Sequence, residues 1–187
     1  MSVNVSAKQL TAHSLSGAAS PAHFSTHLTR TLTECGLEAA HLKLEITESA
    51  LLEYAKETET TLAQLRALGV TVELDDFGTG YSSLSSLQQF PIDTVKIDRS
   101  FISDGSGGGI ANEEIAGAIV ALALTLNKHV TAEGVETFEQ LAALRKLRCT
   151  SAQGHVLSRP ISAAATSAFI RSYEDSSTWS ALWEAPA

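Results

Sequence analysis

The chain has 187 residues, a formal net charge of −8 at pH 7 and 44% hydrophobic residues. The length suits one globular domain, and the acidic balance disfavours nucleic-acid binding through a basic face. The sequence has no apolar run of 18 residues, so we expect no insertion into a membrane. Its two cysteines, Cys35 and Cys149, lack zinc or redox spacing, and no signal-type segment opens the sequence. We therefore expect a cytoplasmic protein.

Six stretches have the alternating or short apolar pattern of β-strands. In chain order they are residues 2–6, 42–48, 70–74, 94–98, 129–136 and 149–154. Helical patterns lie between most of them. This alternation of strands and helices predicts a parallel α/β sheet.

Two of the helical patterns have clear ends. Residues 51–68 carry leucines at helical spacing and stop before Gly69, which suits a C-terminal capping glycine. Residues 113–128 follow Asn112, an expected N-cap.

Three further helices are predicted. Residues 138–148 follow Thr137, with Gln140 three positions later, as in a capping box. Residues 21–35 have a weaker pattern, and residues 163–173 form a helical tail.

The pair Asp75–Asp76, directly after an expected strand, is the most informative feature of the sequence. Two carboxylates about 4 Å apart repel by ~1 kcal/mol in water and by ~4 kcal/mol at a partly buried position. Hard divalent cations, which prefer oxygen ligands, relieve such repulsion. For the pair in isolation, the alternative is a solvated turn in which Asp76 caps the next helix.

Other polar residues also fall where expected strands end. They are Asn4, Glu45, Glu48, Lys96, Glu133 and Gln153. In an α/β barrel the C-terminal ends of the strands form the functional face. A rim of carboxylates, one amine and two amides suits metal-assisted hydrolysis of a phosphate ester. Taken singly, Lys96 would be a solvated lysine and Gln153 a surface amide.

Six segments, in order, resemble the EAL domain family of cyclic-di-GMP phosphodiesterases. They are residues 3–7, 44–49, 75–84, 95–101, 132–136 and 153–155, within a region that extends to about residue 160. The resemblance implies a TIM-like (β/α)8 barrel and cyclic-di-GMP as the ligand.

The resemblance also implies roles for individual residues. Asn4, Glu45 and Asp75 resemble the ligands of a first divalent cation, and Asp75, Asp76 and Glu133 those of a second, with Mg²⁺ or Mn²⁺ as the cofactors. Lys96, Gln153 and Glu133 resemble catalytic residues.

A further set of residues resembles the supporting parts of the family's site. Glu48 resembles the acid that anchors the loop of residues 77–84, and Glu136 resembles a supporting acid. The loop, which the family uses in dimerisation, includes Phe77, Gly78, Thr79, Gly80 and Tyr81. A homodimer is therefore the expected assembly.

The sequence also departs from the family's pattern. The Glu-x-Leu motif that names the family is expected before Asn4 and does not occur there. A complete (β/α)8 barrel needs about 250 residues. We therefore expect an incomplete barrel with about six of eight strands, a domain over residues 1–175 and a tail over 176–187. Other signalling domains are expected in the parent protein.

Two functions follow from these observations. The first is metal-dependent hydrolysis of cyclic-di-GMP to linear pGpG in bacterial second-messenger signalling, weak or lost in this chain. The alternative is a non-catalytic module that binds cyclic-di-GMP or only dimerises. A Glu-x-Leu segment encoded upstream in the same frame would favour the first.

Overall fold

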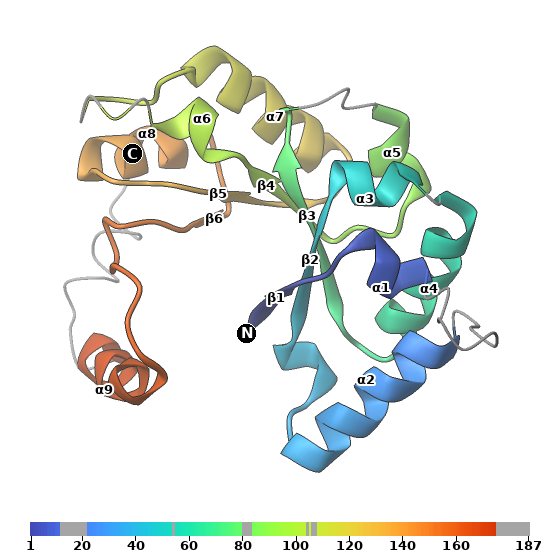
Figure 1. Ribbon diagram of the computed structural model, residues 1–187. Coiled ribbons are helices and arrows are strands. Elements are labelled where there is room, and N and C mark those ends of the chain that lie inside the picture. Colours follow the sequence, from blue (N-terminus) through green and yellow to red (C-terminus); the bar gives the residue numbers. More distant parts are fainter. Residues whose placement is uncertain (12–21, 54, 80–83, 104, 106–107, 175–187) are drawn as a thin grey trace.

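A computed structural model describes residues 1–11, 22–53, 55–79, 84–103, 105 and 108–174. Its centre is one parallel sheet whose strands follow the order of the chain. The strands are β1 (Ser2–Asn4), β2 (Lys43–Thr47), β3 (Thr71–Phe77), β4 (Thr94–Ile97), β5 (His129–Ala132) and β6 (Ser151–Ala152). All six predicted strands are present, but two are much shorter than predicted: the strand expected over 129–136 ends at Ala132, before Glu133 and Glu136, and the one expected over 149–154 is Ser151–Ala152. The sheet curls into a half-barrel with β1 and β6 at its two edges (Figure 1).

The helices lie between the strands. They are α1 (Ala7–Thr11), α2 (Ala22–Cys35), the 3₁₀ turn η1 (Ala39–His41), α3 (Glu48–Glu53), α4 (Ala55–Ala67), α5 (Leu84–Gln89), α6 (Arg99–Ile102), α7 (Glu113–Thr125), α8 (Phe138–Lys146) and α9 (Ala163–Glu174). None of the described helices is both long and apolar enough to cross a membrane.

The predicted helix ends are largely confirmed. Gly69 follows α4 with a φ of +92°, a conformation that favours glycine. The Asn112 side chain accepts a hydrogen bond from the backbone N–H of Ile115 and so caps α7. The predicted helix over 51–68 corresponds to α3 and α4, which lie on either side of residue 54, a position outside the described residues; α3 begins three residues earlier than predicted, at Glu48.

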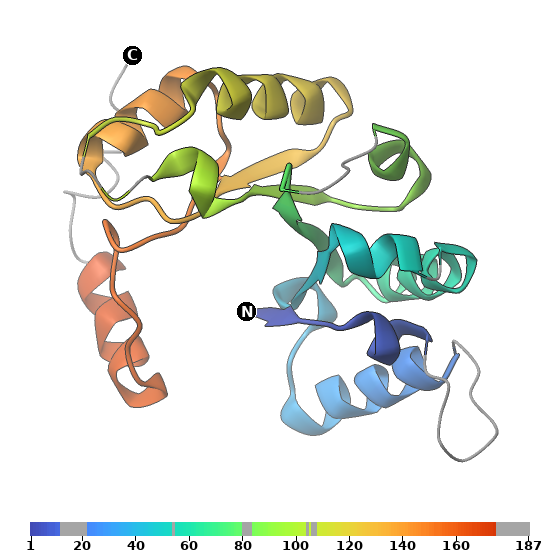
Figure 2. The same ribbon diagram turned by 45° about the horizontal axis from the view of Figure 1, so that its top comes forward.

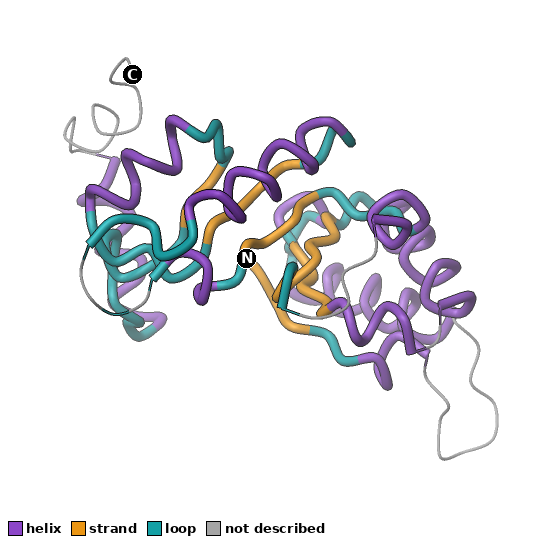
Figure 3. The backbone as a smooth tube through the Cα atoms, turned by 90° about the horizontal axis from the view of Figure 1, so that it is seen from above, coloured by secondary structure: helices purple, strands orange, loops and turns teal. Residues whose placement is uncertain are grey.

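The core of the molecule lies between the sheet and its helices. Alternate strand residues, such as Ile46, Leu74 and Ile97, are fully buried on the outer, convex face. Helices α1 to α8 cover that face, so the apolar strand residues pack against helices as in α/β proteins generally (Figure 3). The opposite, concave face is left for the other half of the strand residues.

Helix α9 stands apart from the other helices. It lies on the opposite side of β5 and β6 from α7 and α8 (Figure 2). Most of its side chains are exposed, Ile170 among them at 50%. The predicted tail helix over 163–173 is thus confirmed. The predicted tail over 176–187 lies outside the described residues.

Candidate metal and catalytic site

The concave face of the described strands is polar. Residues on neighbouring parallel strands that pair in register share a face of the sheet. The residues that share this face are Ser2 and Asn4 on β1, Lys43, Glu45 and Thr47 on β2, Thr71, Glu73 and Asp75 on β3, Thr94 and Lys96 on β4, His129 and Thr131 on β5, and Ser151 on β6. Strand alternation thus brings several of the predicted site residues to one surface.

Lys96 stands at the centre of this face. Its Nζ lies 2.8 Å from Oε2 of Glu45 and 3.0 Å from Oδ1 of Asp75, and it forms a third ion pair with Glu133. Lys96 is 2% exposed, so its charge is almost fully withdrawn from water. One ammonium facing three carboxylates leaves two formal negative charges, which favours the binding of cations.

The pKa values of this group follow from its burial and its partners. Burial alone would lower the pKa of Lys96, but its interactions with Glu133, Glu45 and Asp75 outweigh burial and raise the pKa above the ordinary value. Burial raises the pKa of Glu133, Lys96 opposes this, and the neighbouring carboxylates add to it. Lys96 is therefore a stable cation, and a further positive charge nearby would favour the ionised form of Glu133.

Asp75 and Asp76 lie within a β-bulge of β3. The register between β3 and β4 shifts between Leu74 and Phe77, and Asp76 has a φ of +55°. A bulge changes the direction of side chains and is common beside active sites. Partial burial, then the charges of Asp75 and Asp98, raise the pKa of Asp76. The bulge explains how two consecutive aspartates can both lie near this edge.

The chemistry of these side chains fits hard divalent cations. The buried Oδ1 of Asp75 lies 3.0 Å from the Lys96 ammonium and has no further hydrogen-bond partner among the described residues. Glu45 and Glu133 beside it carry oxygen donors of the kind that Mg²⁺ and Mn²⁺ prefer. In the described part of the chain, no three acidic, histidine or cysteine side chains converge on one point as a preformed metal site would require. The carboxylates are gathered around the Lys96 ammonium instead.

The two predicted amide residues flank this centre. Asn4 pairs in register with Glu45 on the edge strand β1 and is exposed. Gln153 follows β6; its backbone N–H donates to Ala132 and its carbonyl accepts from Val135. These bonds place Gln153, whose side chain is exposed, next to the end of β5, where Glu133 and Gly134 begin the following loop.

Glu48 and Glu136 lie away from Lys96. The sequence placed Glu48 at a strand end, but β2 ends at Thr47 and Glu48 is the buried first residue of α3. Glu136 accepts from Arg99 at 2.5 Å and from the hydroxyl of Ser103 at 3.0 Å. Sequence reasoning missed Arg99 and Ser103, because neither residue lies near Glu136 in the sequence.

The predicted dimer loop is described only in part. Phe77 is buried, and Thr79 donates to the carbonyl of Asp76 through both its backbone N–H and its hydroxyl. Gly78 has a φ of +98°, and a side chain there would press on the ring of Phe101. Gly80 and Tyr81 lie outside the described residues.

A hollow of about 840 Å³ opens beside the carboxylates. Its walls come from the ends of β5 and β6, from the segment that follows them and from α9. The lining includes Arg99, Glu133, Gln153, His155, Arg159 and Phe169. The hollow therefore adjoins Glu133 and Gln153 and contains two arginines.

The sequence model of the EAL domain matches residues 1–160. The chain belongs to the EAL domain family. The resemblance of the six segments is thereby confirmed, and the parallel curled sheet agrees with it.

Individual relatives support the same assignment. The cyclic di-GMP phosphodiesterase NbdA of Pseudomonas aeruginosa is 49% identical over 142 residues, which are 76% of this chain and 18% of NbdA. The structure of the PaMucR phosphodiesterase in complex with c-di-GMP is 42% identical, with a TM-score of 0.75, and the match covers 88% of this chain and 69% of that one. Klebsiella pneumoniae BlrP1 in complex with manganese and c-di-GMP is 28% identical, with a TM-score of 0.71, over 85% of this chain and 38% of BlrP1. This chain thus spans less than a fifth of NbdA.

Proposed function

We propose that this EAL domain binds cyclic-di-GMP and hydrolyses it to linear pGpG with the help of two divalent cations. The observation that carries the proposal is the buried Lys96 surrounded by the carboxylates of Glu45, Asp75 and Glu133 on a polar concave face. Related proteins bound to c-di-GMP, one of them with manganese, support the choice of ligand and cofactor.

Two ligand sets would hold the cations. Asn4, Glu45 and Asp75 form the first and Asp75, Asp76 and Glu133 the second, so that Asp75 bridges them. The chemistry that such cations supply when bound is activation of water and neutralisation of charge on phosphorus. Mg²⁺ and Mn²⁺ both suit these oxygen donors.

The side chains of Lys96 and Gln153 act on the reacting groups. The Lys96 ammonium stabilises the negative charge that develops on the phosphoryl oxygens, and its raised pKa keeps it charged at neutral pH. The Gln153 amide orients the attacking water. Water adds to phosphorus, one P–O bond of the ring breaks, and a proton passes to the leaving oxygen. The product is a linear dinucleotide.

The hollow beside Glu133 suits part of the substrate. Its volume of about 840 Å³ lies within the range of ligand pockets. Arg159 in its wall offers positive charge to a phosphate, whereas the charge of Arg99 is paired with that of Glu136, which also lines the hollow. Glu48, Glu136 and the loop over 77–81 retain their predicted supporting and dimerisation roles, and the cytoplasm is the proposed location.

The open half-barrel favours an alternative, a module that binds cyclic-di-GMP without turnover. Within the described sheet, β1 and β6 each pair with one neighbour, so the polar face is open on both sides. The test is calorimetric titration of the 187-residue chain with cyclic-di-GMP in Ca²⁺, followed by chromatography for linear pGpG in Mg²⁺ or Mn²⁺. Cation-dependent product supports the phosphodiesterase, and binding without product supports the module. If the chain shows no binding and no product, both proposals are contradicted.

A further inference from the structure

Two buried glutamates lie side by side on the concave face. Glu45 on β2 and Glu73 on β3 pair in register, with exposures of 8% and 3%. Neighbouring strands are about 4.8 Å apart, so two carboxylates at these positions repel unless each has its own partner. Because of this repulsion, each carboxylate must point toward a partner of its own.

The two glutamates turn to different lysines. Glu45 contacts Lys96 at 2.8 Å, while Oε1 of Glu73 accepts from Nζ of Lys43 at 2.8 Å and its Oε2 from the Ser2 hydroxyl at 3.4 Å. Glu73 is therefore satisfied without contact to Lys96.

The two lysines lie toward opposite ends of the strands. Lys43 is two residues before Glu45 on β2, whereas Lys96 is two residues beyond Thr94, the partner of Glu73 on β4. The Glu73 carboxylate is thus directed to the N-terminal end of the sheet. The Glu45 carboxylate is directed to the C-terminal end, where Asp75 and Glu133 lie.

We propose that Lys43 is a positioning residue that holds the Glu73 carboxylate out of the candidate metal centre and thereby sets the charge and ligand set of that centre. The inference rests on the proposed binding of divalent cations. Glu73 precedes Asp75 by two residues on the same strand and face, and both ligand sets leave it out.

The burial of the pair shows why Lys43 is needed. The side chain of Glu73 is 3% exposed and cannot be satisfied by bulk water, whereas that of Lys43 is 46% exposed. A buried carboxylate without its partner turns to the next available cation. That cation is Lys96, for which Glu73 would then compete with Glu45, or a divalent ion bound above it.

The experiment compares Mn²⁺ binding by the wild-type chain, Lys43→Met, Glu73→Gln and the double variant, using calorimetry together with thermal unfolding. In Lys43→Met an unpaired carboxylate remains, and we expect Mn²⁺ to bind about threefold to tenfold more tightly. In Glu73→Gln the unpaired ammonium weakens binding by a similar factor. The double variant removes both charges and returns the affinity to within about twofold of wild type.

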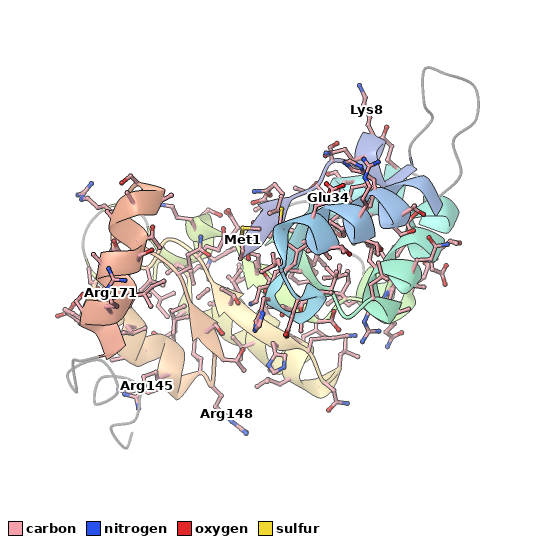
Figure 4. The ribbon with its side chains drawn as sticks, turned by 90° about the horizontal axis from the view of Figure 1, so that it is seen from below. Met1, Lys8, Glu34, Arg145, Arg148 and Arg171 are labelled. Atoms are coloured by element: carbon pink, nitrogen blue, oxygen red, sulfur yellow. The ribbon has the colours of Figure 1, made fainter. Side chains whose placement is uncertain are left out.

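Two further variants act as controls. Lys43→Arg keeps a cation within reach of Glu73 and should bind Mn²⁺ as wild type does. Lys8→Met removes one lysine charge from α1, where Lys8 points away from the body of the protein (Figure 4), and should leave the affinity unchanged.

The outcomes separate this inference from the proposed function. If the Lys43–Glu73 ion pair is purely structural, both single variants melt at a lower temperature but bind Mn²⁺ with unchanged affinity. This result overturns the positioning role. Weaker binding by Lys43→Met overturns it as well. If Lys43→Met does not fold, the other two variants decide. Weaker Mn²⁺ binding by Glu73→Gln, restored to the wild-type affinity in the double variant, supports the positioning role of Lys43. A wild-type chain that binds no Mn²⁺ overturns the two-cation proposal itself, and the positioning role with it.

Discussion

Lys96 on β4 and Glu45 on β2 form an ion pair of 2.8 Å across the strand that separates them. Because β3 lies between the two, their side chains meet only where the sheet curls toward its concave face. In a barrel, curvature turns the inward residues of non-adjacent strands toward one another. The fold thus brings together charges that are 51 positions apart in the sequence.

Replacement of this lysine should separate catalysis from binding. We expect Lys96→Ala to lower the rate of cyclic-di-GMP hydrolysis by at least about 100-fold, because its charge stabilises the transition state. Substrate binding should weaken much less. Single-turnover kinetics and calorimetry on the same preparation measure the two effects, with Lys8→Ala as the control. A loss of binding in proportion to the rate would make Lys96 a substrate anchor instead.

Asp75 has a different part in the proposed site. Asp75→Asn removes one charge from both proposed cation sites at once, so we expect turnover to be abolished and Mn²⁺ binding to weaken by more than about tenfold. Product chromatography at saturating Mg²⁺ or Mn²⁺ and a Mn²⁺ titration measure this. Asp93→Asn is a matched control, because Asp93 pairs with Arg66 outside the site. Substantial retained turnover would exclude a bridging role.

Local patterns allowed much of the fold to be predicted. The six strands and the caps at Asn112 and Thr137 depend on residues within a few positions of each other, and the structure contains them all. The end of β2 was missed by one residue, which moved Glu48 from a strand end into α3. The boundary was ambiguous because Thr47 and Glu48 continue the alternation of the strand.

The remaining parts of the site depend on distant residues or on backbone geometry. The Arg99–Glu136 pair joins residues 37 positions apart, and the Lys43–Glu73 pair joins residues 30 apart. Only the register of the sheet reveals that Lys43 and Glu73 share a face. The bulge at Asp76 needs a positive φ in a non-glycine residue, which no sequence pattern here indicated.

The capping box of α8 offers a test of stability. Gln140 is 1% exposed; its Oε1 accepts from the backbone N–H of Glu136 at 2.8 Å and its Nε2 donates to the carbonyl of Ile102 at 3.1 Å. Gln140→Ala removes the Oε1 acceptor from the backbone N–H groups of Glu136 and Thr137, whereas the carbonyl of Ile102 keeps its bond from Ala111. The loss should lower the free energy of unfolding by about 1–3 kcal/mol. Urea denaturation measures the change. Glu139→Gln, on the exposed side of the same helix turn, is the control. If both substitutions change the free energy of unfolding by the same small amount, the stabilising role of the capping box is contradicted.

The two thiols should react at different rates. Burial raises the pKa of Cys149, although hydrogen bonds to nearby backbone groups oppose this, and Cys149 is 5% exposed. Cys35, at the end of α2, is exposed. At pH 8 we therefore expect one thiol per chain to react quickly with a disulfide reagent, and Cys35→Ser to abolish that phase. Two rapidly reacting thiols in the native protein would contradict the buried position of Cys149. As a control, both thiols should react rapidly in denaturant.

The edges of the sheet predict the assembly of the chain. In the described sheet β1 and β6 each have one neighbour, and Val3 on β1 is 41% exposed. An open edge with exposed apolar residues tends to pair with another chain, and a charged residue on the edge opposes this. We expect light scattering to show a dimer or larger species, and Val3→Lys to shift it toward the monomer.

A matched variant locates the contact. Ile170→Lys places the same charge at an equally exposed position on α9, away from the β1 edge, and should leave an edge-paired dimer intact. A dimer that survives Val3→Lys would exclude pairing through β1 and favour the predicted contact through the loop of residues 77–84. A monomer at every concentration would contradict self-association altogether, because the exposed edge would then be stable in water without a partner.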